Sequence, residues 1–273
     1  MRELIDCHTH TERCGHAVGT VEEYVRVAVE RGLVGMAITE HLPLPEGMDP
    51  HNHVSMPSCD LEEYLVEVDF VRDRYPEITI VTGVEADYLP DRMDEVRATI
   101  DDATKRADGA RLVLGSVHLL DGWTFDDPHT LDSWASRDVD RVWEEYFATW
   151  GDACRTGLFH VMAHPDLVKK FGHVPSFDRR ELYAEAARVA AESGVLIEVS
   201  TAGLRKPVGE LYPGPELLKA FFDAGVAATV GSDAHTPDEV GMQIDLAYDA
   251  MAEAGYESAA FPDGSGGWRA IPL

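Results

Sequence analysis

Histidines and carboxylates recur at short spacings along the chain, in an arrangement that suits metal binding. Nine of them are candidate ligands: His8, His10, His16, His41, Glu85, His118, His164, Asp233 and His235. Neutral imidazole and carboxylate are suitable ligands for divalent ions such as Zn, Mn or Fe. Nine candidates exceed the three or four ligands that a single catalytic zinc takes from protein. The sequence therefore predicts two or three divalent metal ions.

The spacing within these segments indicates how the side chains would share ions. His8 and His10 are two residues apart, as are Asp233 and His235. Alternation along a strand makes such a pair point the same way, so both members can reach one ion. The two oxygens of Glu85 could bridge two ions. A divalent ion lowers the pKa of bound water toward about 7, so hydroxide becomes available as a nucleophile at neutral pH.

Seven short apolar runs place these residues, because each candidate segment lies at the end of one run. We expect strands at 4–8, 33–39, 78–85, 111–118, 159–164, 195–200 and 227–232. Apolar and often β-branched runs of this length are typical of strands that are buried on both faces. Only the sixth run supplies no candidate ligand.

Amphipathic segments alternate with these runs. We expect helices at 21–31, 61–74, 92–105, 138–155, 179–192, 215–224 and 240–253. Seven strand-then-helix units favour parallel strands joined by right-handed crossovers, in an open sheet or a closed barrel. In a parallel barrel all the carboxyl ends of the strands open onto one rim, which is where such folds place chemistry. The long irregular connection 42–59 is typical of a functional loop, and 256–273 predicts a terminal hairpin.

Composition limits the kind of partner and compartment. The 273 residues include 23 Lys plus Arg and 50 Asp plus Glu, which gives a formal net charge of −27. This charge disfavours binding to nucleic acid, because repulsion replaces the usual gain from counterion release. An acidic composition is also compatible with a saline cytoplasm. We expect no signal peptide, no membrane span and no disulfide framework, and hence a cytoplasmic, single-domain protein. The sequence does not indicate an oligomeric state.

The ordered motifs H-T-H, E-H, G-V-E, G-S-V-H, A-H-P and S-D-A-H resemble those of the PHP family, the polymerase and histidinol phosphatase domains. The resemblance extends over essentially the whole chain. It implies a distorted seven-stranded (β/α)7 TIM-like barrel spanning 1–273. It also implies that all nine candidates are metal ligands, and suitable residues fill all nine positions.

Within the family, the segments 115–123 and 200–213 are similar to those of stand-alone histidinol-phosphate phosphatases. This similarity implies hydrolysis of L-histidinol phosphate to L-histidinol and phosphate in histidine biosynthesis. The alternatives are another small phosphate, nucleotide-derived or sugar, and, less favoured, a non-catalytic metal-binding domain. An exonuclease-like activity conflicts with the acidic charge. An amidohydrolase-type barrel would call for a bridging lysine that the sequence lacks.

Several residues outside the ligand set are candidate contacts for a small phosphorylated substrate. Arg205 follows the sixth strand and could hold phosphate oxygens through two N–H groups, and Lys206 beside it is a second candidate. Asp233 or His235 could assist protonation of the leaving alkoxide, and the sequence does not choose between them. Lys169 and Lys170 are interpreted as a surface pair. Asp6 could orient a ligand histidine or cap a buried turn.

Overall fold

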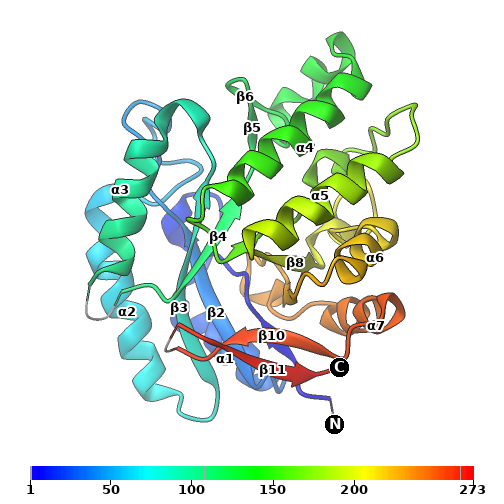
Figure 1. Ribbon diagram of the computed structural model, residues 1–273. Helices are drawn as coiled ribbons and strands as arrows, with labels where there is room; N and C mark the ends of the chain where they lie inside the picture. The colour runs from blue at the N-terminus through cyan, green and yellow to red at the C-terminus, as the bar shows by residue number, and fades with distance from the viewer. Residues whose placement is uncertain (1, 107–108, 265) are drawn as a thin grey trace.

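The computed structural model describes residues 2–106, 109–264 and 266–273, in which seven parallel strands form a barrel (Figure 1). Neighbouring strands follow the order β1-β2-β3-β4-β7-β8-β9. The strands are β1 Ile5–Asp6, β2 Gly35–His41, β3 Thr79–Asp87, β4 Leu112–Ser116, β7 Val161–Met162, β8 Leu196–Ser200 and β9 Ala228–Gly231. The predicted distorted seven-stranded (β/α)7 barrel is confirmed.

Backbone hydrogen bonds between the first and last strands close the barrel. The N–H of Cys7 donates to the carbonyl of Val230 at 2.8 Å, and that of His10 donates to the carbonyl of Ala234 at 2.9 Å. The closure is partial, because β1 is only two residues long. The segments that carry the first and last candidate ligands therefore lie side by side at this seam.

Seven helices surround the barrel (Figure 1). They are α1 Val21–Glu30, α2 Leu61–Arg74, α3 Met93–Thr104, α4 Val139–Arg155, α5 Arg180–Ser193, α6 Pro215–Asp223 and α7 Ile244–Ala254. Thr20 begins α1 with a capping box to Glu23, which satisfies backbone N–H groups that the first turn would otherwise leave free. Gly194 ends α5 in the left-handed conformation, where a residue without Cβ is favoured. No helix in the described part of the chain is both long and apolar enough to cross a bilayer.

The predicted terminal hairpin is confirmed. Strands β10 Ser258–Pro262 and β11 Trp268–Pro272 pair antiparallel. The ring of Phe261 packs on Gly35, where an added Cβ would come within 2.5 Å of the ring. Since Gly35 begins β2, the hairpin lies at the amino-terminal end of the strands, opposite their carboxyl rim. A second, shorter hairpin, β5 Leu119–Leu120 with β6 Trp123–Thr124, follows β4 on the rim side.

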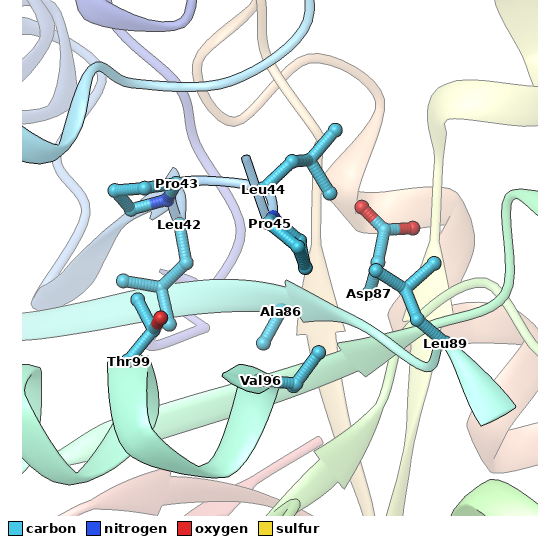
Figure 2. Close-up of a pocket in the computed structure, with 9 residues that line it drawn as sticks. All are labelled: Leu42, Pro43, Leu44, Pro45, Ala86, Asp87, Leu89, Val96 and Thr99. Atoms are coloured by element: carbon cyan, nitrogen blue, oxygen red, sulfur yellow. The ribbon is translucent and has the colours of Figure 1, made fainter. Parts of the chain in front are cut away.

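The long connection after β2 packs against β3 and α3. Met56 is fully buried, and its N–H donates to the carbonyl of His41 at 3.1 Å. Figure 2 shows the small apolar pocket left between Leu42 and Pro45 of this connection and Val96 of α3. The only charged side chain that lines this pocket is Asp87 at the end of β3. The connection therefore lies close to the carboxyl rim of the barrel.

Candidate metal centre

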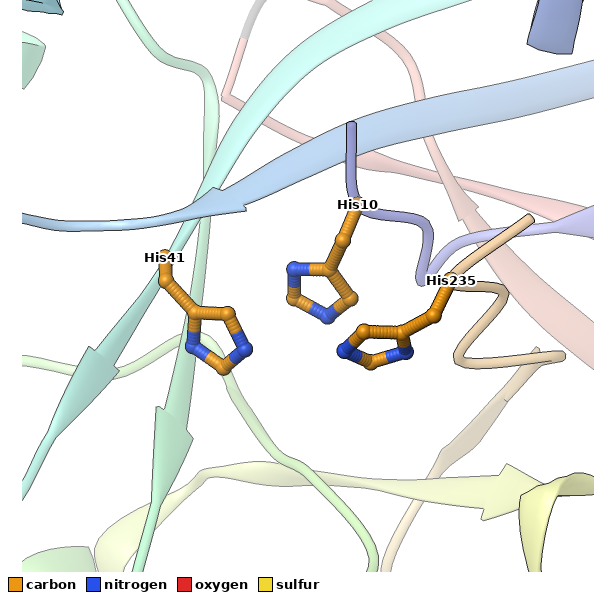
Figure 3. A group of neighbouring side chains, drawn as sticks. All are labelled: His10, His41 and His235. Atoms are coloured by element: carbon orange, nitrogen blue, oxygen red, sulfur yellow. The ribbon is translucent and has the colours of Figure 1, made fainter. Parts of the chain in front are cut away.

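Eight of the nine candidate ligands form three neighbouring groups at the carboxyl rim, two of which share His10. The ligand atoms within each group all lie within 4.8 Å of one another. The groups are His10, His41 and His235 (Figure 3); His8, His10 and Asp233; and Glu85, His118 and His164. The ninth candidate, His16, lies beside the first group, with its Nε2 atom 3.0 Å from Nε2 of His235. Segments from the ends of six strands thus converge on one centre.

Glu85 lies between the groups. Its Oε2 atom is 3.0 Å from Nδ1 of His41 and 3.4 Å from Nε2 of both His8 and His10. Its Oε1 atom is 3.2 Å from Nε2 of His164. The parallel register pairs Glu85 with His41 across β2 and β3, which sets the two side chains at the same level. A carboxylate in this position can contact ions held by different groups.

Two candidate ligands occupy unusual backbone conformations. His164 has φ of 29° and Asp233 has φ of 50°. The left-handed region is uncommon for residues with a Cβ, and such strain concentrates at functional sites because the surrounding structure imposes it. Both residues follow the last residues of their strands, β7 and β9, so these turns aim the side chains into the rim.

The buried polar atoms of the centre fit divalent ions. Among the described residues, Nε2 of His8, Nε2 of His10 and Oε2 of Glu85 are buried without a hydrogen-bond partner. An unpaired buried polar group costs about 1–3 kcal/mol. Here several such atoms face one another within ion-binding distance, and imidazole and carboxylate are the appropriate donors. The residues present therefore fit two or three ions such as Zn, Mn or Fe.

Burial and neighbouring charges shift the pKa values of several groups in the centre. Burial lowers the pKa of His10, but the nearby carboxylates of Asp233, Glu40 and Glu85 outweigh it and raise the pKa to about 9. Burial opposes the charged form of Asp233 as well, and the neighbouring histidines hold its pKa well below its usual value. Burial and the neighbouring His10 lower the pKa of His235 to about 3. Bound cations would take over the role of these protons, because they invert the local preference for charge.

Three further carboxylates contact the other ring nitrogens of the candidate ligands. Oε1 of Glu198 lies 2.9 Å from Nδ1 of His8, and Oδ1 of Asp87 lies 2.8 Å from Nδ1 of His118. Oε1 of Glu40 is 3.6 Å from Nδ1 of His10. The sequence analysis missed all three, although an acid inside the apolar strand Leu196–Ser200 is a signal that could have found Glu198.

Asp6 contacts the candidate ligand His8 through the backbone, and in the described part of the chain it contacts no histidine ring. Its carboxylate accepts the backbone N–H groups of His8, Ser232 and Gly241 and the hydroxyl of Ser232. Asp6 therefore organises the turn after β9, which is the alternative interpretation.

Arg205 lies at the edge of the same centre. It ends the short helix Ala202–Arg205, and its Nη2 atom donates to the carbonyl of Ser232 at 2.7 Å. Nε is 3.2 Å from Oε1 of Glu239. Nη1 is buried and has no hydrogen-bond partner among the described residues. Lys206 is exposed beside it.

The interpretation of Lys169 and Lys170 as a surface pair is wrong for Lys169, which is buried. Its Nζ atom contacts Oδ2 of Asp166 at 2.8 Å and the carbonyl of Leu211 at 2.8 Å. It thereby ties the loop that carries Arg205 to the turn after His164. Lys170 pairs with Asp126 at 3.0 Å.

Comparison with known proteins agrees with this geometry. The model of the PHP domain matches residues 6–202. The chain belongs to the PHP family. The last two candidate ligands, Asp233 and His235, lie beyond the matched range.

Two relatives and one solved structure are similar to this chain over nearly its whole length. A probable histidinol-phosphatase of Deinococcus radiodurans is 36% identical and covers 96% of this chain and 97% of its own length. The histidinol-phosphatase of Bacillus subtilis is 28% identical, and the match covers 91% of this chain and 98% of that protein. The crystal structure of a histidinol phosphate phosphatase of Lactococcus lactis, in complex with Zn, L-histidinol and phosphate, superposes with a TM-score of 0.80 at 22% identity. The match covers 97% of this chain and 98% of that chain. The predicted resemblance to histidinol-phosphate phosphatases is confirmed.

Proposed function

We propose that this protein uses divalent metal ions to hydrolyse a phosphate monoester, namely L-histidinol phosphate, to L-histidinol and phosphate in histidine biosynthesis. The observation that carries the proposal is the convergence of eight candidate ligands in three neighbouring groups, with unpartnered buried atoms facing one another around Glu85. The named activity of the relatives, and the ligands of the Lactococcus lactis enzyme, support the choice of substrate.

The proposed ligand set is the full list of nine: His8, His10, His16, His41, Glu85, His118, His164, Asp233 and His235. Two or three Zn, Mn or Fe ions held there would polarise the phosphoryl oxygens and lower the pKa of bound water. Glu85 would bridge between ions, since its two oxygens face different groups.

The remaining steps are assigned to this chain's own residues. Nη1 of Arg205 is buried and without a partner among the described residues, so it can donate to an oxygen of the phosphate. Lys206 would add positive charge at the exposed edge. Asp233 or His235 would assist protonation of the leaving alkoxide, and both lie in the segment that Arg205 contacts.

The substrate is proposed to be small and the protein cytoplasmic, with residues 1–273 as one domain. A net charge of −27 supports a small ester over nucleic acid, because a long polyanion would be repelled by the acidic surface beyond the few cationic groups of the site. Bound cations can attract one phosphate group locally, although the acidic surface around them would repel the remaining phosphates of a polyanion.

The test is phosphate release by metal-stripped protein that has been reloaded with Zn, Mn or Fe. L-histidinol phosphate is compared with phosphoserine, nucleoside monophosphates and sugar phosphates. We expect a clear preference for histidinol phosphate, abolished by chelator and by Asp233→Asn. Asp178→Asn, which changes an exposed carboxylate that pairs with Arg180, is the matched control. Turnover of another ester alone would replace the substrate, and bound metals with no turnover of any ester would contradict an enzymatic function.

A further inference from the structure

Glu198 is a buried carboxylate whose two oxygens serve two different candidate ligands. It is the only charged residue of β8 and is 1% exposed. Its Oε1 atom lies 2.9 Å from Nδ1 of His8, and its Oε2 atom accepts the backbone N–H of His164 at 2.8 Å. Gly231 on the neighbouring strand leaves the necessary space, because a Cβ there would come within 2.0 Å of Oε1.

The contact with His8 determines which ring nitrogen can bind a metal. An ionised carboxylate only accepts hydrogen bonds, so Nδ1 of His8 must carry the proton. Nε2 is then left with its lone pair, and it faces Oε2 of Glu85 at 3.4 Å and Oδ1 of Asp233 at 3.7 Å. Histidine ligands in metal proteins are commonly oriented in this way by an outer carboxylate.

The contact with His164 supports a strained turn. His164 has φ of 29°, and its N–H is held by the second oxygen of Glu198. Its Nε2 atom lies 3.2 Å from Oε1 of Glu85, in the group that also contains His118. His8 belongs to a different group, with His10 and Asp233. A single carboxylate therefore links two of the three groups.

We propose that Glu198 is a positioning residue that sets the metal affinity of both groups at once, through the ring of His8 and the backbone of His164. This inference rests on the metal-holding roles proposed above for these two histidines. It assigns Glu198 no contact with substrate.

The isosteric change Glu198→Gln separates this role from simple packing. A glutamine side chain offers one acceptor and one donor group. If its oxygen accepts from Nδ1 of His8, its NH2 group opposes the N–H of His164. If its oxygen accepts from His164, its NH2 group forces Nδ1 of His8 to accept, and the proton moves to the nitrogen that would face the metal. Neither orientation satisfies both histidines.

Asp87→Asn is the matched control. In the described part of the chain, the Asp87 carboxylate makes a single polar contact, from Oδ1 to Nδ1 of His118 at 2.8 Å. An asparagine can rotate its amide to present its one oxygen to that nitrogen, so the tautomer of His118 is kept. The same carboxylate-to-amide change is thus expected to disturb one site strongly and the other weakly.

The experiment is calorimetric titration of metal-stripped protein with Zn, in competition with a chelator. Removal of an outer partner typically costs about 10- to 100-fold in metal affinity, and we expect this loss for Glu198→Gln at two ions. Asp87→Asn should stay within about threefold of wild type. Zn affinities of Glu198→Gln that stay near the wild-type values at every ion would overturn the inference. So would a loss confined to one ion.

A second measurement uses only the wild-type protein, in case Glu198→Gln does not fold. Ring ¹⁵N shifts of the Zn-loaded protein should show His8 protonated at Nδ1, and protonation at Nε2 would overturn the inference. The outcomes also distinguish failure of the proposed function from failure of the role proposed for Glu198. Tight Zn binding without hydrolysis of any ester would refute the enzymatic activity and leave the role of Glu198 intact, whereas wild-type protein that binds no Zn would refute both.

Discussion

Arg205→Met tests the contact between this chain and the phosphate. The substitution keeps most of the apolar stem but removes the guanidinium. Nη1 has no partner among the described residues, whereas Nη2 donates to the carbonyl of Ser232 at 2.7 Å. A hydrogen bond to a charged group contributes about 1.5–3 kcal/mol. Loss of one Nη1–phosphate contact should therefore lower kcat/KM for histidinol phosphate by about 10- to 150-fold, since each 1.36 kcal/mol is about tenfold in rate.

The assay for this variant combines steady-state kinetics with inhibition by inorganic phosphate. We expect the inhibition constant for phosphate to rise together with the fall in kcat/KM, while the metal content stays at the wild-type level. Arg188→Met on α5, which removes an exposed arginine paired with Glu185 and Glu192, is the control. If Arg205→Met left phosphate inhibition unchanged, or lowered activity only by losing metal, then Arg205 would serve to brace the Ser232–Asp233 turn instead.

Three further outcomes follow from the structure. Chelator should lower the Tm, and restored Zn at about 1,000 times its Kd should return about 4 kcal/mol of stability, as measured by thermal unfolding. Lys169→Met should lower the free energy of unfolding in urea by about 3 kcal/mol, because the buried carboxylate of Asp166 would lose its only cationic partner among the described residues and keep the N–H of Gly214; an unchanged midpoint would contradict this. Burial opposes the charged form of His118, but Asp87 raises its pKa from 6.5 to about 10. The stabilisation that protonated His118 gains from Asp87 is fully present below pH 6.5 and is lost as the pH rises toward 10. The Tm of metal-free protein should therefore fall over this pH range. Zn-loaded protein should not, because its histidines are already neutral.

The barrel could be predicted from the sequence because both of its signals are local. Buried strands read as short apolar runs, and the helices between them read as amphipathic segments. The strand lengths differ from the prediction next to two of the candidate ligands. Strands β1 and β7 have two residues each, whereas the sequence predicts five and six. The chain leaves the regular ladder early at these strands, because the turns that follow must aim His8 and His164 into the rim. The start of α7 shifts to Ile244, since the preceding residues form a short 3-10 helix and a turn.

The candidate ligands could be predicted because each lies at the end of an apolar run. Their division into groups could not, since His10 belongs with both His8 and His41, and only the barrel's curvature brings these rings together. The pairing of His8 with Glu198 joins residues 190 positions apart, which no local pattern encodes. Lys169 was misread because the loop that buries it lies about forty residues further on, with Leu211 42 positions away.

The seam between the first and last strands determines when the centre can exist during synthesis. His16 and His235 are neighbours in space but lie 219 residues apart along the chain. A nascent chain that has not yet reached β9 carries His8, His10 and His41 without the partners that complete two of the three groups. With the proposed ligands, the two groups that contain Asp233 or His235 could bind metal only after almost all of the barrel has left the ribosome, whereas the group of Glu85, His118 and His164 is complete earlier. Once the ions bind, they fasten the earliest and latest strands together, so the contacts of highest sequence separation, which are the slowest to form, are also the ones that metal locks in place.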